Sequence, residues 1–164
     1  MKLIFTILFF FICIGINAQV KTTAIKSVEA FYKAYLQGQQ RVDQNGMPAK
    51  GIVTIERFLY VELKIGTKLL VEEVAYNNKK IKIVETVLIG QKAKVGTKIN
   101  AEIATELIAK KGYTFWLVTL ESKNKDDNDM GKALKNINIK TKVGPKYFNF
   151  SIKEETEILG PEMQ

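Results

Sequence analysis

The side chains that could do chemistry in this chain are carboxylates, lysines, tyrosines and hydroxyls, because the 164 residues contain no histidine and one cysteine, Cys13. A Ser-His-Asp triad, a Cys-His pair and a His-ligated metal site all need an imidazole, so none of them can form. What these residue types leave open is proton transfer or nucleophilic attack by a pair of carboxyl groups. Any reaction therefore depends on which carboxylates the fold brings together.

The densest group of carboxylates is the loop 125–131, Lys-Asp-Asp-Asn-Asp-Met-Gly, which partly matches the Asp-x-Asp-x-Asp-Gly start of calcium loops. Counting from Asp127 puts Gly131 at position five, where an oxygen ligand is needed, and counting from Asp126 puts Met130 there. Neither count reaches an acidic residue at position twelve. We therefore predict a solvated loop, with no metal site and no cofactor.

The other carboxylates do not form an obvious catalytic pair. Glu72 and Glu73 are adjacent, so on a strand they point to opposite faces. Glu56 and Glu62 share a face but stand six residues apart. We expect no enzyme, and surface roles for these side chains. The alternative is a carboxylate-type glycan hydrolase, which needs two carboxyl groups ~5–10 Å apart in one cleft.

The first eighteen residues have the three parts of a cleavable signal peptide: Lys2, an apolar run from residue 3 to 16, and Ala18 before Gln19. Bulky residues precede Cys13 where a lipoprotein signal has a small one, so we expect release in soluble form. The predicted organisation is a signal peptide over 1–18 and a single domain over 19–164. The predicted location is the periplasm, the cell surface or the extracellular space.

The net charge is +8, and the excess is lysine, since arginine occurs only at Arg41 and Arg57. A lysine-rich surface could attract an anionic envelope component, such as an acidic glycan, lipopolysaccharide or anionic lipid. Another envelope protein is the alternative partner. The scarcity of arginine argues against specific nucleic-acid binding. After residue 18 no stretch approaches the ~20 apolar residues of a membrane helix, so no span is expected after cleavage.

The elements that must position these side chains are predominantly strands. Residues 69–76 and 79–89 flank Asn77-Asn78, and residues 136–143 and 146–153 flank Gly144-Pro145, which predicts two hairpins. Residues 53–63 alternate between apolar and polar, with Arg57 as the exception on the apolar face. Residues 113–120 are apolar on both faces, which predicts a central strand with Trp116 as a core residue.

Residues 23–37 and 100–111 fit either a helix or a strand, and strand is favoured in both. Regularly spaced strands of this kind predict an all-β fold. The expected architecture is an Ig-like β-sandwich of about seven to eight antiparallel strands, with room for one short N-terminal or central helix.

Three segments, Ala30 to Tyr35, Val74 to Lys80 and Tyr147 to Lys153, together resemble small secreted bacterial β-proteins of unassigned function. The resemblance covers most of the chain after the leader. It implies a secreted β-domain and transfers no site residue.

Three aromatic residues are candidates for a binding surface because they share a strand face with polar residues: Phe58, Tyr60 and Tyr147. The expected function is an exported, non-catalytic binding or envelope-associated module of unknown ligand. The hydrolase is one alternative. The other is a β-barrel that carries a lipid or small ligand.

Overall fold

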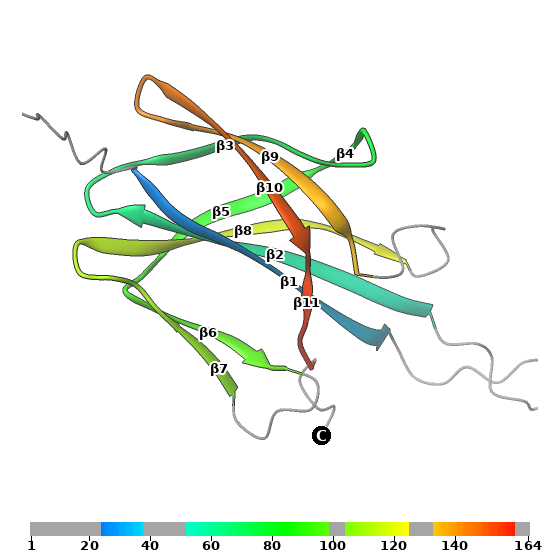
Figure 1. Ribbon diagram of the computed structural model, residues 1–164. Helices are drawn as coiled ribbons and strands as arrows, with labels where there is room; N and C mark the ends of the chain where they lie inside the picture. Colours follow the sequence, from blue (N-terminus) through cyan, green and yellow to red (C-terminus); the bar gives the residue numbers. More distant parts are fainter. Residues whose placement is uncertain (1–23, 38–51, 99–103, 125–132, 160–164) are drawn as a thin grey trace, which may run out of the picture.

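The computed structural model describes residues 24–37, 52–98, 104–124 and 133–159, and these segments are all-β with no helix (Figure 1). The strands are β1 (Ile25–Gln37), β2 (Ile52–Lys64), β3 (Leu69–Tyr76), β4 (Lys79–Ile81), β5 (Ile83–Gly90), β6 (Lys92–Thr97), β7 (Ala104–Ile108), β8 (Tyr113–Asn124), β9 (Lys135–Val143), β10 (Lys146–Glu154) and β11 (Thr156–Glu157). The strand interpretation of the two ambiguous segments is confirmed for residues 25–37 by β1 and for residues 104–108 by β7, whereas residues 23 and 100–103 lie outside the described residues.

The described strands form three sheets with the orders β11-β1-β2-β8-β5, β10-β9-β3-β4 and β6-β7. Every pair is antiparallel except β1 with β11, which is parallel. The eleven strands exceed the seven to eight expected. One reason is that β6 turns only two apolar side chains, Ala93 and Val95, toward the protein interior. An alternation of two apolar residues is too short to predict a strand.

Two apolar cores lie on opposite faces of the five-stranded sheet. The first joins its inner face to the four-stranded sheet, with Leu59, Val118 and Ile139 among the fully buried residues. The second lies under the β6–β7 hairpin and contains Phe31 and Phe115. Figure 1 shows the five-stranded sheet between the other two. The central position of β8 between β2 and β5 explains why residues 113–120 are apolar on both faces.

The hairpin predicted around Asn77-Asn78 is confirmed as β3–β4, and both asparagines adopt the positive φ that such a turn needs, 45° and 61°. The strand expected over 79–89 is divided, however. It leaves the four-stranded sheet after Ile81 and enters the five-stranded sheet at Ile83, so Lys82 marks a crossing between the two.

The second predicted hairpin is confirmed as β9–β10, with Gly144 at φ 57° in its two-residue turn. After β10 the chain crosses to the five-stranded sheet at Glu155 and ends its described part beside β1, where Phe31 pairs with Thr156. The crossings at Lys82 and Glu155, together with the turn between β2 and β3, therefore connect the two sheets that share the first core.

Candidate functional site

The face of the four-stranded sheet that points away from the first core, called here the outer sheet face, is lined by polar residues in cross-strand rows. Strand alternation produces it, because Ile137, Ile139 and Val143 point into the core and their neighbours point out. Three rows run across β3, β9 and β10: Leu70–Lys142–Tyr147, Glu73–Lys140–Asn149 and Ala75–Asn138–Ser151.

Tyr147 is the exposed aromatic residue of this face, with 55% of its surface accessible. The ammonium nitrogens of Lys140 and Lys142 lie 5.4 and 5.3 Å from its ring centroid. Of the three aromatic residues named as binding candidates, Tyr147 is thus the exposed one. A ring beside two cations can stack on a flat apolar ligand surface while the cations attract an anion.

A shallow hollow of about 330 Å³ lies in the next two rows, lined by Glu73, Ala75, Asn138, Lys140 and Asn149 among others. The two amides can each donate and accept hydrogen bonds, which suits hydroxyl-rich ligands. The carboxylates of this region are paired: Glu73 with Lys80 at 2.8 Å, and Glu72 with Lys140 at 3.4 Å.

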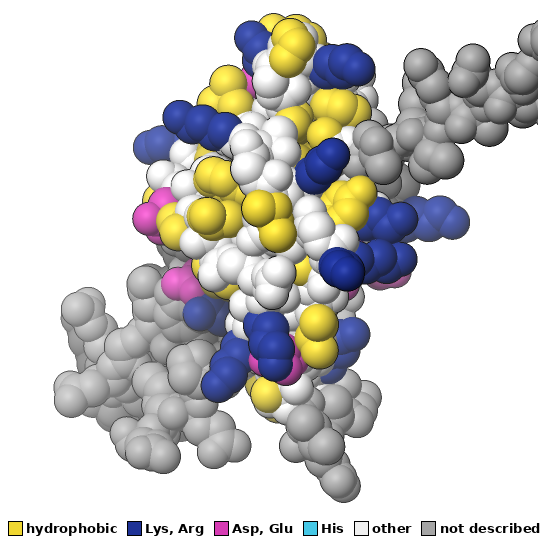
Figure 2. All heavy atoms as spheres, turned by 90° about the vertical axis from the view of Figure 1, so that its left-hand side faces the viewer, with side chains coloured by type: hydrophobic (Ala, Val, Ile, Leu, Met, Phe, Trp, Pro, Cys, Tyr) yellow, Lys and Arg dark blue, Asp and Glu magenta, His cyan; other side chains and the backbone are white. Residues whose placement is uncertain are grey.

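Lys142 differs from Lys80 and Lys140, because among the described residues it forms no ion pair and its ammonium group lies beside the Tyr147 ring. Figure 2 views the end of the molecule that carries the β9–β10 turn, and there Lys and Arg side chains are spread over the surface with little acidic surface among them. The outer sheet face can therefore offer a half-buried cation without an ion-pair partner among the described residues, next to an exposed ring.

The other two candidate aromatics belong to the second core. Tyr60 is only 7% exposed and meets the Phe31 ring edge to face, with centroids 5.7 Å apart. Burial raises the pKa of Tyr60 above its ordinary value. Phe58 is half-buried against the same cluster, with the Lys33 ammonium 5.2 Å from its ring centroid. Tyr60 therefore serves packing, because the β6–β7 hairpin covers a face that the pattern of β2 alone leaves open.

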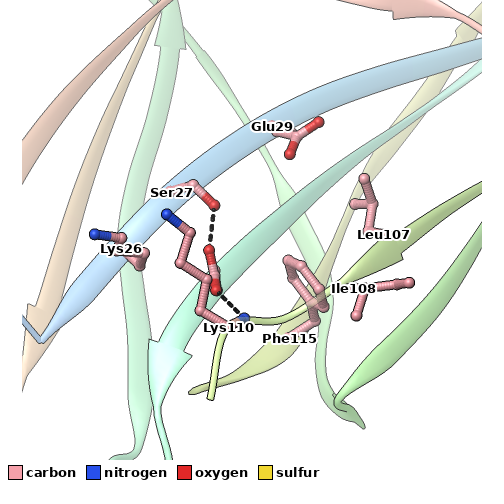
Figure 3. Close-up of a pocket in the computed structure, with 8 residues that line it drawn as sticks. Lys26, Ser27, Glu29, Leu107, Ile108, Lys110 and Phe115 are labelled. Carbon is pink, nitrogen blue, oxygen red and sulfur yellow. Dashed lines mark hydrogen bonds between the residues drawn. The ribbon is translucent and has the colours of Figure 1, made fainter. Parts of the chain in front are cut away.

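A pocket of about 310 Å³ lies at one end of the second core and is lined by Glu29 and Glu62, together with Phe115 and Leu107 (Figure 3). Glu62 is buried, and its two oxygens accept hydrogen bonds from the Ser27 hydroxyl at 2.9 Å and the Lys110 backbone N–H at 2.7 Å. The two bonds connect β1 and β2 to the turn before β8.

Glu29 and Glu62 were not expected as a pair, because they lie far apart in the sequence. The register brings them together: Ser27 pairs with Glu62, and Glu29 follows two residues along the same face. Diagonal neighbours of this kind are ~7–8 Å apart at the backbone. No local pattern could have revealed the pair, whereas the alternating Asn and Lys of residues 136–142 already signalled the outer sheet face.

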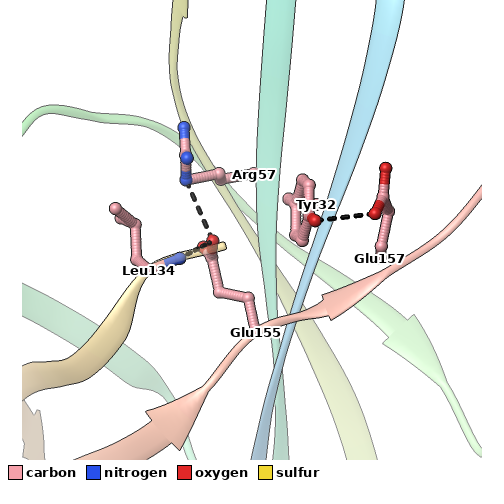
Figure 4. Close-up of polar contacts among 5 residues, drawn as sticks. All are labelled: Tyr32, Arg57, Leu134, Glu155 and Glu157. Carbon is pink, nitrogen blue, oxygen red and sulfur yellow. Dashed lines mark hydrogen bonds and ion pairs between the residues drawn. The ribbon is translucent and has the colours of Figure 1, made fainter. Parts of the chain in front are cut away.

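A buried polar cluster surrounds the crossing at Glu155 (Figure 4). Arg57 Nε donates to Glu155 Oε2 at 3.1 Å, and the same oxygen accepts the Leu134 backbone N–H at 3.0 Å. Burial raises the pKa of Glu155, and the Arg57 guanidinium opposes the rise. Next to this cluster, Tyr32 donates to Glu157 at 2.8 Å. These contacts attach the β10–β11 segment to β1 and β2, which is a structural role.

An apolar groove of about 420 Å³ lies between the β2–β3 turn and β5, with Ile65, Leu88 and Trp116 in its lining. Trp116 is half-buried and packs against the first core, and among the described residues its indole N–H has no acceptor. The predicted placement of Trp116 in a central strand is confirmed.

The loop 125–131 and residues 1–23 lie outside the described residues. In the described segments, no group of three or more acidic side chains gathers closely enough to hold a metal ion. Nor do those segments contain a helix long and apolar enough to cross a membrane.

Comparison of the chain with protein-family models, with curated proteins and with solved structures finds no significant match.

Proposed function

We propose that this protein is an exported, non-catalytic binding module of the Ig-like β-sandwich type that binds an acidic glycan of the cell envelope on its outer sheet face. The sandwich assignment is supported by two sheets that share one apolar core. Export is supported by the leader-like first eighteen residues.

The observation that carries the binding proposal is the position of Tyr147, exposed and flanked by the ammonium groups of Lys140 and Lys142. An exposed aromatic ring on a monomeric surface is a common ligand platform because its apolar area gains from being covered. The ring can stack on the apolar face of a pyranose, and Lys142 can pair with the carboxylate of a uronic acid.

The adjacent hollow supplies the remaining chemistry. Asn138 and Asn149 can exchange hydrogen bonds with sugar hydroxyls, and Glu73 can accept one. The rows run across three neighbouring strands, so the platform is on rigid elements. Because the surface is shallow and partly wet, the expected affinity is modest and strongly dependent on salt.

Titration calorimetry with polygalacturonate as the acidic glycan and dextran as the neutral control tests the proposal. Binding to polygalacturonate at about 50 mM salt should weaken several-fold at about 300 mM, and dextran should not bind. Tyr147→Ala and Lys142→Gln should each reduce the affinity about fivefold or more. The matched control is Lys94→Gln, an exposed lysine of β6 on another sheet.

Two outcomes would count against the proposal. An equal loss in Lys94→Gln and Lys142→Gln would mean that general charge attraction, without a defined surface, drives binding. Absence of binding to polygalacturonate at low salt, with binding to anionic phosphatidylglycerol vesicles, would replace the glycan with a lipid headgroup.

The pocket of Glu29 and Glu62 favours a second candidate function, a carboxylate-type glycan hydrolase. Two carboxylates line one cavity, on neighbouring strands, at a spacing compatible with that chemistry. Against it, both Glu62 oxygens already accept hydrogen bonds from the protein. Release of reducing ends from polygalacturonate or peptidoglycan, lost in both Glu29→Gln and Glu62→Gln, would establish the hydrolase. The binding proposal predicts no release.

A further inference from the structure

The exposed apolar residues of the described chain concentrate on one strand, β5. Of the nine large hydrophobic residues that are exposed, four lie in β5: Val84, Val87, Leu88 and Ile89. β5 is the last strand of the five-stranded sheet, and in the part of the chain that the structure describes no strand pairs with its other side. Its outer backbone groups and its apolar side chains therefore form one edge available for pairing.

In the four-stranded sheet, both edge strands carry the charges that normally prevent strand pairing. β4 contains Lys79 and Lys80, and β10 contains Lys146 and Lys153. β11 is only two residues long. β5, with the sequence Ile-Val-Glu-Thr-Val-Leu-Ile-Gly, has no lysine or proline, and Glu85 is its one charged residue. In a chain with 25 lysines and arginines, an eight-residue edge without either stands apart.

We propose that this edge pairs with β5 of a second copy of the chain, antiparallel about a two-fold axis, so that two five-stranded sheets become continuous. An added strand must be apolar on both faces, because Leu88 points to the face of Trp116 and Val87 to the face of Leu117. β5 itself meets this requirement. A two-fold axis makes the contact self-complementary, as closed dimers require.

The single charge of β5 does not prevent the pairing. An axis through Val87 places each Glu85 opposite residues 88–90 of the second copy, and the two carboxylates are then about four residues apart along the strands, ~13 Å. That separation exceeds the Debye length of ~8 Å at physiological salt. The contact also extends into the groove beside Leu88, where Ile65 is exposed as well.

The size of the contact sets the expected strength. An eight-residue strand is ~27 Å long, and with the groove it gives an interface at the small end of the specific range. We therefore expect a dimer with a dissociation constant in the micromolar range. Each copy carries a net charge of +8, so added salt should strengthen the dimer by screening the repulsion. This salt response is opposite to that of glycan binding.

Sedimentation of the protein purified after expression of the full chain tests the inference. The wild type should change from monomer to dimer as its concentration rises through the micromolar range, and Val87→Lys should stay monomeric. The matched control is Ile108→Lys, because Ile108 is 66% exposed but lies in β7, and this variant should dimerise normally. Hydrogen exchange gives a second measurement: the β5 amides that point away from β8 should gain protection only when the dimer forms, whereas those that face β8 are protected in the monomer as well.

A monomer at every concentration would overturn the inference, as would a dimer that persists in Val87→Lys without protection of β5. Protection of the outward-facing β5 amides in a monomer would also overturn it, by showing that another segment of the chain covers the edge. None of these outcomes bears on Tyr147 or on polygalacturonate binding, so failure here is distinguishable from failure of the proposed function.

Discussion

Arg57 on β2 and Glu155 at the β10–β11 crossing form an ion pair with an Nε–Oε2 distance of 3.1 Å, in which neither side chain is exposed to solvent. The second Glu155 oxygen is also buried and accepts no hydrogen bond from the described residues. A carboxylate in this position depends on its cation, because the water that would otherwise solvate it has been removed.

Removing one member of this pair should therefore cost far more than removing both. Arg57→Ala should lower the free energy of unfolding by about 3–5 kcal/mol, whereas the double change Arg57→Met with Glu155→Leu should be near neutral. Urea denaturation monitored by circular dichroism measures both. The exposed pair Lys135–Glu154, at 3.3 Å, is the control, and Lys135→Met should cost less than about 1 kcal/mol. A similar loss for both pairs would contradict the expected difference.

The pH dependence of stability should carry a contribution from Glu155. Burial raises the folded-state pKa of this carboxyl, so the folded protein holds the proton more tightly than the unfolded chain. The contribution is present below the ordinary carboxyl pKa and is lost as pH rises through the folded value. As pH rises from the ordinary carboxyl pKa through the folded-state pKa of Glu155, the wild type should therefore lose unfolding free energy relative to the double variant Arg57→Met with Glu155→Leu. A difference that is constant with pH would contradict the raised pKa.

Tyr32 should ionise at a higher pH than an ordinary tyrosine. Burial and the hydrogen bond to Glu157 raise the pKa of Tyr32 to about 12 from 10.0. Its contribution to stability is present below pH 10 and is lost as pH rises toward 12, by the same linkage. Ultraviolet titration of the phenolates should show late ionisation that decreases by one tyrosine in Tyr32→Phe, the remainder belonging to buried Tyr60. A step unchanged in that variant would assign the late ionisation to another tyrosine.

Trp116 should report on the first core. We expect blue-shifted emission in the folded protein, and a loss of about 3 kcal/mol for Trp116→Ala, the low end for a large aromatic side chain because this one is half-buried. Trp116→Phe should cost less, since the indole N–H gives up no hydrogen bond to a described residue. Tyr147→Ala is the exposed control and should stay within about 0.5 kcal/mol. Solvent-like emission from Trp116 would contradict its placement.

Export can be checked by mass. The leader predicts a mature protein that begins at Gln19 and is released in soluble form. Mass spectrometry of the exported protein should give that N-terminus. A species that begins at Cys13 with added acyl mass would replace soluble release with membrane anchoring.

The parts of the fold that sequence alone predicted are those governed by local chemistry. The β3–β4 and β9–β10 turns follow from asparagine and glycine residues that accept positive φ, and the alternation of β9 predicts its outward lysines and asparagines. Arg57 was visible as an exception on an apolar face, but its partner Glu155 lies 98 residues away. Such distant pairs depend on register between strands, which no short pattern encodes.

No short sequence pattern reveals that the β6–β7 hairpin covers one face of the five-stranded sheet. Tyr60 and Phe58 alternate with buried residues in the way that solvent-facing aromatics do, and only the packing of β6–β7 places Tyr60 in a core. The division of residues 79–89 at Lys82 is the same kind of effect, because continuous strand propensity does not reveal that the chain changes sheets.

The parallel contact between β1 and β11 has a consequence for the timing of folding. Tyr32 and Glu157 are 125 residues apart, and β11 joins the five-stranded sheet by pairing with β1. Contacts of such long separation slow folding, since bringing two distant segments together costs loop-closure entropy before the contact is gained. A chain delivered from its N-terminus would keep β1 without its β11 neighbour until residues 156–157 arrive. For a protein that is exported as proposed, slow formation of this contact would leave the polypeptide unfolded for longer, the state in which a chain can pass through a narrow channel.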